Sequence, residues 1–223
     1  RSSRILRGLD FFVLDSAFAT LGGNVRETPE TASRLLVTAG GSDPTGITLK
    51  TLRALEQIQN ALLDVRIVIG PAFADDVASE TTKLAADSRH RVTTRFHPDN
   101  LAEDIAWCDM AVSASGLTKY ELAAMGVPAI LLSIDDNHAT LTQAFDAFGT
   151  TCHLGQVDQV TTTVLAKAIA DLLADPDTRF AMSSAGPAIL DGRGATRLAT
   201  AIIATMDAVS KQNTEFRVSE APK

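Results

Sequence analysis

Cysteine is scarce in this 223-residue sequence, which contains only Cys108 and Cys152. Two cysteines so far apart cannot form the disulfide framework of a small secreted domain, and a zinc or iron–sulfur site would need further ligands close by. We therefore expect both thiols to be reduced and buried in a cytoplasmic protein. Nothing in the sequence calls for a metal or a cofactor.

Long apolar runs are also lacking, since none approaches the roughly 20 residues that a membrane helix needs. The start of the chain has no apolar stretch of the signal-peptide kind. Basic residues are outnumbered, with 20 against 27 acidic ones and a formal net charge of -7. We expect a soluble protein without a nucleic-acid partner, in which a bound phosphate is held by backbone donors and helix ends.

Short apolar runs alternate with stretches of helical period from Arg34 onward. The predicted strands are Leu35–Ala39, Val65–Ile69, Val92–Phe96, Met110–Ala114, Ala129–Ile134 and the weaker Thr151–Leu154. The predicted helices are Ile47–Gln59, Ala72–Asp87, Leu101–Cys108, Lys119–Met125, Ala139–Phe148, Thr162–Ala174, Thr178–Leu190 and Ala195–Val209. This order predicts an α/β fold with a doubly wound, Rossmann-like parallel sheet, whose strand C-terminal edge binds the ligand.

The two ends of the chain do not follow the alternation. We expect residues 1–33 to be an N-terminal arm and linker, in which Gly8–Leu14 with Phe18 packs on the core as a strand or an arm. Residues 34–210 form the predicted domain. Residues 211–223 are polar and are expected to be a frayed tail.

The loop after the first strand contains Gly40, Gly41, Ser42 and Asp43, followed by Pro44. Two glycines let the backbone approach a ligand, and the amides at the start of the next helix favour an anion. The spacing is neither the dinucleotide fingerprint nor a P-loop. A tight turn, with Asp43 as the helix N-cap and Pro44 at the first helical position, is an equally open interpretation.

The loop after the fourth strand runs through Ala114, Ser115, Gly116, Leu117 and Thr118 directly into a helix. Small residues and hydroxyls at a helix N-terminus on the ligand edge form a suitable diphosphate site. Glu121, in the first helical turn, is then placed to accept a hydrogen bond from a ribose hydroxyl. The alternative is a capping box, because Thr118 and Glu121 have the Ser/Thr-x-x-Glu spacing.

Polar residues follow two further strands. Asn137 and His138 come after the fifth strand and could touch phosphate or sugar, although a solvated loop before a helix is the simpler interpretation. Phe96 is the last residue of the third strand and His97 follows it. We interpret this pair either as part of a turn or as part of a pocket that holds a nucleotide base. We expect His153 to be structural.

Three segments, in this order, carry a family resemblance: Gly40 to Pro44, Ala114 to Ala129, and Asp191 to Arg197. They resemble the C-terminal half of the UDP-sugar hydrolases of pseudaminic-acid synthesis and their spore-coat polysaccharide relatives. The chain is more distantly similar to the glycosyltransferase that makes lipid II, which implies one half of a GT-B fold. The resemblance extends from about Leu6 to about Val209.

The resemblance also implies roles for individual residues. Ser113 to Thr118 would hold the UDP diphosphate, Glu121 the ribose, and Phe96 with His97 the uracil, while Gly40 to Asp43 face the same cleft. The segment Asp191 to Arg197 leads into the last helix, and a ligand contact of Arg193 is left open. Two positions depart from the family pattern: Leu117 replaces a second glycine, and Asn137-His138 replaces Asn-Gln.

The function implied is hydrolysis of a UDP-activated deoxy-amino sugar, with release of UDP, in polysaccharide biosynthesis. The catalytic general base is expected in an N-terminal domain outside this sequence. Two alternatives remain: the donor-binding domain of a glycosyltransferase, and a nucleotide-sugar binding module without turnover.

Overall fold

The computed structural model describes residues 5–22 and 27–219 and contains a six-stranded parallel sheet in the order β3-β2-β1-β4-β5-β6. The strands are β1 (Arg34–Thr38), β2 (Asp64–Ile69), β3 (Arg91–Phe96), β4 (Met110–Ala114), β5 (Ala129–Ser133) and β6 (Thr151–Gln156). The predicted doubly wound α/β fold is confirmed, and every strand predicted from Leu35 onward is present.

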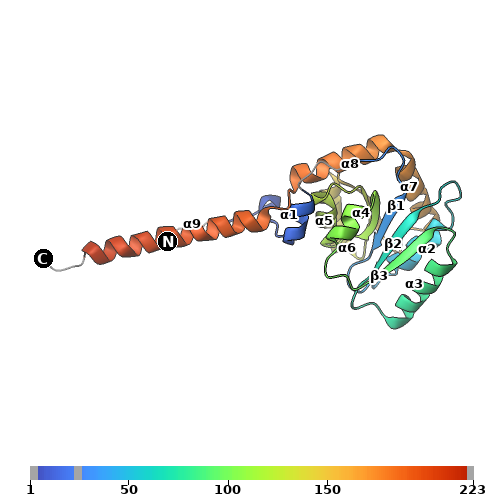
Figure 1. Ribbon diagram of the computed structural model, residues 1–223, viewed down its shortest axis with the longest axis horizontal. Coiled ribbons are helices and arrows are strands. Elements are labelled where there is room, and N and C mark those ends of the chain that lie inside the picture. The colour runs from blue at the N-terminus through green and yellow to red at the C-terminus, as the bar shows by residue number, and fades with distance from the viewer. Residues whose placement is uncertain (1–4, 23–26, 220–223) are drawn as a thin grey trace.

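Helices cover both faces of this sheet (Figure 1). They are α1 (Ser16–Leu21), α2 (Ile47–Leu55), α3 (Asp75–Asp87), α4 (Ala102–Trp107), α5 (Thr118–Ala124), α6 (Asp136–Asp146), α7 (Thr162–Ala174), α8 (Pro176–Ile189) and α9 (Gly194–Ser219), after the short 3-10 helix η1 (Leu9–Phe11). None of them, in the part of the chain that the structure describes, is long and apolar enough to span a membrane.

Two apolar clusters, one on each face, hold the layers together. Leu35 and Val37 of β1 point into the cluster that contains α2 and α7, whereas Leu36 points into the cluster with α4 and α5. A strand buried on both faces has to be apolar throughout, which explains the unbroken hydrophobic runs in the sequence. Burial of these runs is the main favourable contribution to folding.

The N-terminal arm forms helices η1 and α1. The described segment Gly8–Leu14, for which a strand was one of two expectations, contains no strand. Asp15 begins α1, because its carboxylate accepts a hydrogen bond from the Ala17 amide at 2.8 Å. Phe18 is 2% exposed in the apolar cluster beside α4 and α5, and the Phe12 ring lies 4.1 Å from the Tyr120 ring. The arm therefore packs across α5.

Several helices begin or end away from the predicted positions. Helix α6 begins at Asp136 because Asp135 caps it, and α8 begins at Pro176 because Asp175 accepts from the Thr178 amide. Helix α9 projects from the domain and continues to Ser219, so the expected tail is helical up to that residue (Figure 1). Residues 1–4, 23–26 and 220–223 of the predicted arm, linker and tail lie outside the described residues.

Arg179, in the second turn of α8, is completely buried. Its guanidinium donates to the carbonyls of Leu172 and Leu173 at 2.7 and 2.6 Å, and to those of Pro29 and Glu30 at 2.8 Å each. The carbonyls in the last turn of α7 have no partner within that helix, so a cation there is favourable. Arg179 thereby fastens the segment before β1 to the end of α7.

We expect Arg179→Met to lower the free energy of unfolding by about 3 kcal/mol, because four buried or part-buried carbonyls lose a charged donor. Chemical denaturation of both proteins measures the change. The matched control is Arg53→Met, since Arg53 makes an exposed ion pair with Glu80 and its loss should change stability by at most about 0.5 kcal/mol. A loss of less than about 1 kcal/mol for Arg179→Met would contradict this role.

Candidate functional site

The predicted site residues all lie at the edge formed by the strand C-termini. Strands β1 and β4 are neighbours, with Thr38 opposite Ser113. The loops that follow them lead to α2 and α5 on opposite faces of the sheet. Doubly wound folds bind their ligands where two such loops diverge. Phe96 and His97 are farther away, because β2 separates β3 from β1.

In the loop after β1, Asp43 is occupied by structural hydrogen bonds. It is 4% exposed, and its carboxylate oxygens accept from the amides of Ile47 and Thr48 at 2.8 Å each. The expectation that the α2 amides would be free for an anion is therefore wrong. The alternative is not confirmed either, because the N-cap of α2 is Gly46 and its first residue is Ile47. Asp43 accepts from the first amides of the helix from a position outside the cap.

The two glycines of this loop pack against the turn after β2. The Gly41 carbonyl accepts from the Ala72 amide at 2.8 Å. A Cβ on Gly70 would lie 2.5 Å from the Gly40 and Gly41 carbonyl oxygens, so only glycine fits there. Gly40 itself has a φ of 76°, a region that favours glycine. The loop is thus rigidly supported from its β2 side.

The loop after β4 presents free backbone donors. The amides of Gly116, Leu117 and Thr118 make no hydrogen bond with any described residue. A Cβ on Gly116 would meet nothing within 4 Å, and the Leu117 side chain is 71% exposed. Thr118 is the first residue of α5 and its N-cap Leu117 has no side-chain cap, so the capping-box alternative is not formed.

Glu121 lies one turn into α5, between the loop and the N-terminal arm. Burial raises the pKa of its carboxyl, the Thr118 hydroxyl donates to it and lowers the pKa in part, and the nearby Asp15 raises it further. The carboxylate is therefore poorly compensated within the described chain. Such a group gains from a hydroxyl donor supplied by a ligand.

A buried polar network that we did not predict lies behind the same loop. The Ser115 hydroxyl is 2.9 Å from that of Ser133, which is 2.8 Å from Nε2 of His153. The ammonium of Lys119 donates to the Ser115 carbonyl at 3.0 Å. One sequence signal was available: Ser133 is a hydroxyl residue at the end of the apolar run Ala129–Leu132.

The remaining predicted residues differ in how freely they face solvent. Phe96 is 55% exposed and packs edge to face with His97, whose φ is 46°. His138 belongs to the first turn of α6, and its Nδ1 lies 2.8 Å from the Asp135 carboxylate that caps the helix. Asn137 is exposed in the same turn. The expected loop at Asn137 and His138 is therefore a helix start.

The segment from Asp191 to Arg197 has structural contacts. Asp191 accepts from the Arg193 amide and pairs with the Arg197 guanidinium, which lowers the pKa of Asp191 to about 2. A Cβ on Gly194 would lie 2.0 Å from the Phe12 carbonyl oxygen, so α9 begins in direct contact with the arm. The Arg193 side chain is exposed.

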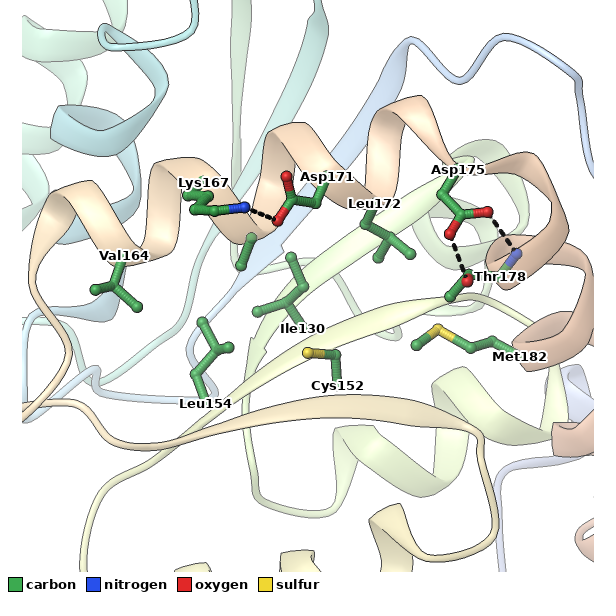
Figure 2. A pocket seen from close by; sticks show the side chains of 11 residues that line it. Ile130, Cys152, Leu154, Val164, Lys167, Asp171, Leu172, Asp175, Thr178 and Met182 are labelled. Carbon is green, nitrogen blue, oxygen red and sulfur yellow. Dashed lines mark hydrogen bonds and ion pairs between the residues drawn. The ribbon is translucent and has the colours of Figure 1, made fainter.

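An apolar cavity of about 390 Å³ lies elsewhere, between α7, α8 and the strands β5 and β6. Figure 2 shows the side chains of Ile130, Cys152 and Met182 around it, with the Lys167–Asp171 ion pair on α7. None of the predicted site residues lines this cavity. Within residues 5–22 and 27–219, no cluster of three or more His, Cys, Asp or Glu side chains could hold a metal ion.

Comparison with known families identifies the domain. The family described as "Glycosyltransferase family 28 C-terminal domain" matches residues 35–195, from β1 to the start of α9 and more than half of the chain. The chain belongs to this family. The loops after β1 and β4 both lie within the matched part of this glycosyltransferase family 28 domain.

Curated relatives agree with this assignment. The domain is 24% identical over 203 residues to the spore coat polysaccharide biosynthesis protein SpsG of Bacillus subtilis, covering 91% of this chain and 58% of SpsG. It is 28% identical over 176 residues to the UDP-N-acetylglucosamine–N-acetylmuramyl-(pentapeptide) pyrophosphoryl-undecaprenol N-acetylglucosamine transferase of Halorhodospira halophila, covering 77% of this chain and 48% of that protein. The chain thus spans about half the length of these relatives.

The solved structures show the same fold. The family 28 domain matches the crystal structure of Acinetobacter baumannii MurG with a TM-score of 0.65 and 20% identity, over 80% of this chain and 54% of that one. The predicted spore-coat relationship and the GT-B half are confirmed. The finer prediction of a pseudaminic-acid UDP-sugar hydrolase finds no support in these relatives, whereas the glycosyltransferase alternative fits them.

We expect Glu121→Gln to stabilise the family 28 domain at neutral pH. Because the carboxyl pKa is raised in the fold, the folded state holds this proton more tightly than the unfolded state. Stability therefore falls as the pH rises from the unfolded pKa of about 4.3 through the higher folded one. Thermal unfolding between pH 4 and pH 8 should show a smaller fall for the variant than for the wild type.

The matched control for this change is Glu103→Gln, at an exposed glutamate in the first turn of α4. This variant should not gain stability at neutral pH. If Glu121→Gln were less stable than the wild type at pH 7, the carboxylate would be a structural group of the loop.

Proposed function

We propose that this chain binds the UDP moiety of a UDP-sugar and is the donor-binding half of a glycosyltransferase-like enzyme of polysaccharide biosynthesis. The observation that carries the proposal is the row of free amides at Gly116, Leu117 and Thr118, in the loop after β4 and next to the loop after β1. Membership of glycosyltransferase family 28 supports it, as does the UDP-N-acetylglucosamine named for the Halorhodospira halophila relative.

Each part of the nucleotide has a proposed partner. The diphosphate accepts hydrogen bonds from the amides of residues 116–118, because backbone donors at a helix start favour an anion. Glu121 accepts from a ribose hydroxyl, which offsets the cost of its burial. The exposed Phe96 ring and His97 cover the uracil.

Two further segments complete the proposed site. Gly40 to Asp43 form the opposite wall of the site, with Gly40 and Gly41 offering close backbone approach. Asn137 and His138, in the first turn of α6, lie on the side of the sugar. The Asp135 carboxylate holds the His138 ring in one orientation. The neighbouring Asn137 side chain is exposed.

The reaction proposed for the complete enzyme is transfer of the sugar. The bond between the anomeric carbon and the β-phosphate oxygen breaks, and UDP leaves with the bonding electrons. An acceptor hydroxyl bonds to the anomeric carbon and loses its proton to a base. Free amides near the departing oxygen stabilise the charge that develops there. With water as acceptor the same chemistry is hydrolysis, and we place the base that decides the acceptor outside this chain.

Gly116→Ala tests where the diphosphate lies. The added Cβ meets nothing within 4 Å in the protein, so the variant should fold with an unchanged melting temperature. If phosphate oxygens approach this backbone, the methyl group should weaken UDP binding at least about tenfold, since one or two charge-assisted hydrogen bonds are lost. Calorimetric titration with UDP measures this.

Titrations with CDP and dTDP serve as controls for the base. The wild type should select UDP, and the unfolding curve of Gly116→Ala shows that the fold is intact. Failure of the wild type to bind UDP would refute the proposed function. Full UDP affinity in the glycine variant would place the diphosphate elsewhere.

A further inference from the structure

Lys119 carries a buried positive charge directly behind the loop after β4. The residue is 3% exposed, although it lies in the first turn of α5. Its ammonium donates to the Ser115 carbonyl at 3.0 Å and lies 3.5 Å from the Thr142 hydroxyl. The Tyr120 ring lies 5.0 Å away. All of these partners are neutral.

No carboxylate of the described residues lies within ion-pair distance of this ammonium. Burial of an unpaired ammonium is unfavourable, and burial accordingly lowers the pKa of Lys119. The titratable group that faces it from β6 is His153. Burial lowers the pKa of His153, the charge of Asp146 raises that pKa in part, and the charge of Lys119 lowers it further. A methionine would fill similar space without the charge, so the charge itself needs a reason.

The hydrogen bond from Lys119 to the Ser115 carbonyl determines the orientation of the peptide group that follows Ser115. The Ser115 carbonyl and the Gly116 amide belong to one peptide group, and in a trans peptide they point in opposite directions. Because the carbonyl points inward to Lys119, the Gly116 N–H points outward. A hydrogen bond from a cation to the carbonyl also polarises the peptide and makes its N–H a stronger donor. Gly116 is one of the free amides, with open space around its Cα.

We propose that Lys119 is a positioning residue for the diphosphate: it fixes and polarises the Ser115–Gly116 peptide, and its unpaired charge balances the phosphates without touching them. This inference rests on the proposed function. The Ser115–Ser133–His153 chain supports the same peptide, since Ser115 is held through its side chain as well as its carbonyl. Phosphate charge on the ligand supplies the compensation that the protein does not.

Lys119→Met, in the 223-residue chain, tests the inference with three ligands of decreasing negative charge. These are UDP, UMP and uridine, each titrated against the protein by nuclear magnetic resonance. We expect UDP binding to weaken about ten- to hundredfold, UMP binding to weaken less, and uridine binding to stay unchanged, because the interaction scales with ligand charge. A structural defect would weaken all three alike.

The matched control is Lys50→Met. Lys50 also donates to backbone carbonyls, those of Val157 and Val160, but it belongs to α2. This variant should leave the order and size of the three affinities as in the wild type. If Lys119→Met does not fold, Lys119→Gln retains a donor for the Ser115 carbonyl without the charge and should show the same ranking of losses.

The outcomes separate the two proposals. A wild type that does not bind UDP refutes the proposed function, and this inference with it. If the wild type binds UDP but the Lys119 variants lose all three ligands equally, or lose none, the proposed function stands and the role of Lys119 is refuted.

Discussion

The parallel pairing of β1 with β4 brings the loop after the first of these strands next to the loop after the second. The chain builds β1, β2 and β3 outward in one direction and then returns to place β4 on the other side of β1. The loops after β1 and β4 consequently start side by side and run to opposite faces of the sheet. In a doubly wound fold, a ligand at this edge of the sheet meets both of these loops.

The loop after β1 and the loop after β4 use their backbone groups differently. After β1, the Asp43 carboxylate accepts hydrogen bonds from the first two amides of α2, so these two donors already have partners within the protein. After β4, the amides of residues 116–118 make no hydrogen bond with any described residue, while Ser115 and Lys119 hold the buried side of the loop. A well-supported loop with unsatisfied donors is pre-organised for an anion, because ligand binding requires little further ordering.

The N-terminal arm is part of the same construction. Helix α1 and Phe12 cover α5, the arm places Asp15 near Glu121, and the start of α9 packs against Phe12. Burial of Glu121 against this arm raises the energy of its charged form. Glu121, the residue proposed to bind the ribose, therefore lowers the stability of the folded domain. Binding residues commonly reduce folding stability in this way.

The sequence by itself determined the fold class, the strands and the loops that meet at the ligand edge, because period and turn residues are local properties. Helix ends were less predictable: Asp135 and Asp175 start α6 and α8 early, and the N-cap of α2 is Gly46 rather than Asp43. Only the tertiary structure showed that Lys119 is buried behind Ser115 and that Ser133 meets His153. Those contacts join the loop after β4 with α5, β5 and β6. They form by packing between elements distant in the sequence, so a local pattern such as the hydroxyl at the end of an apolar run does not identify the partner.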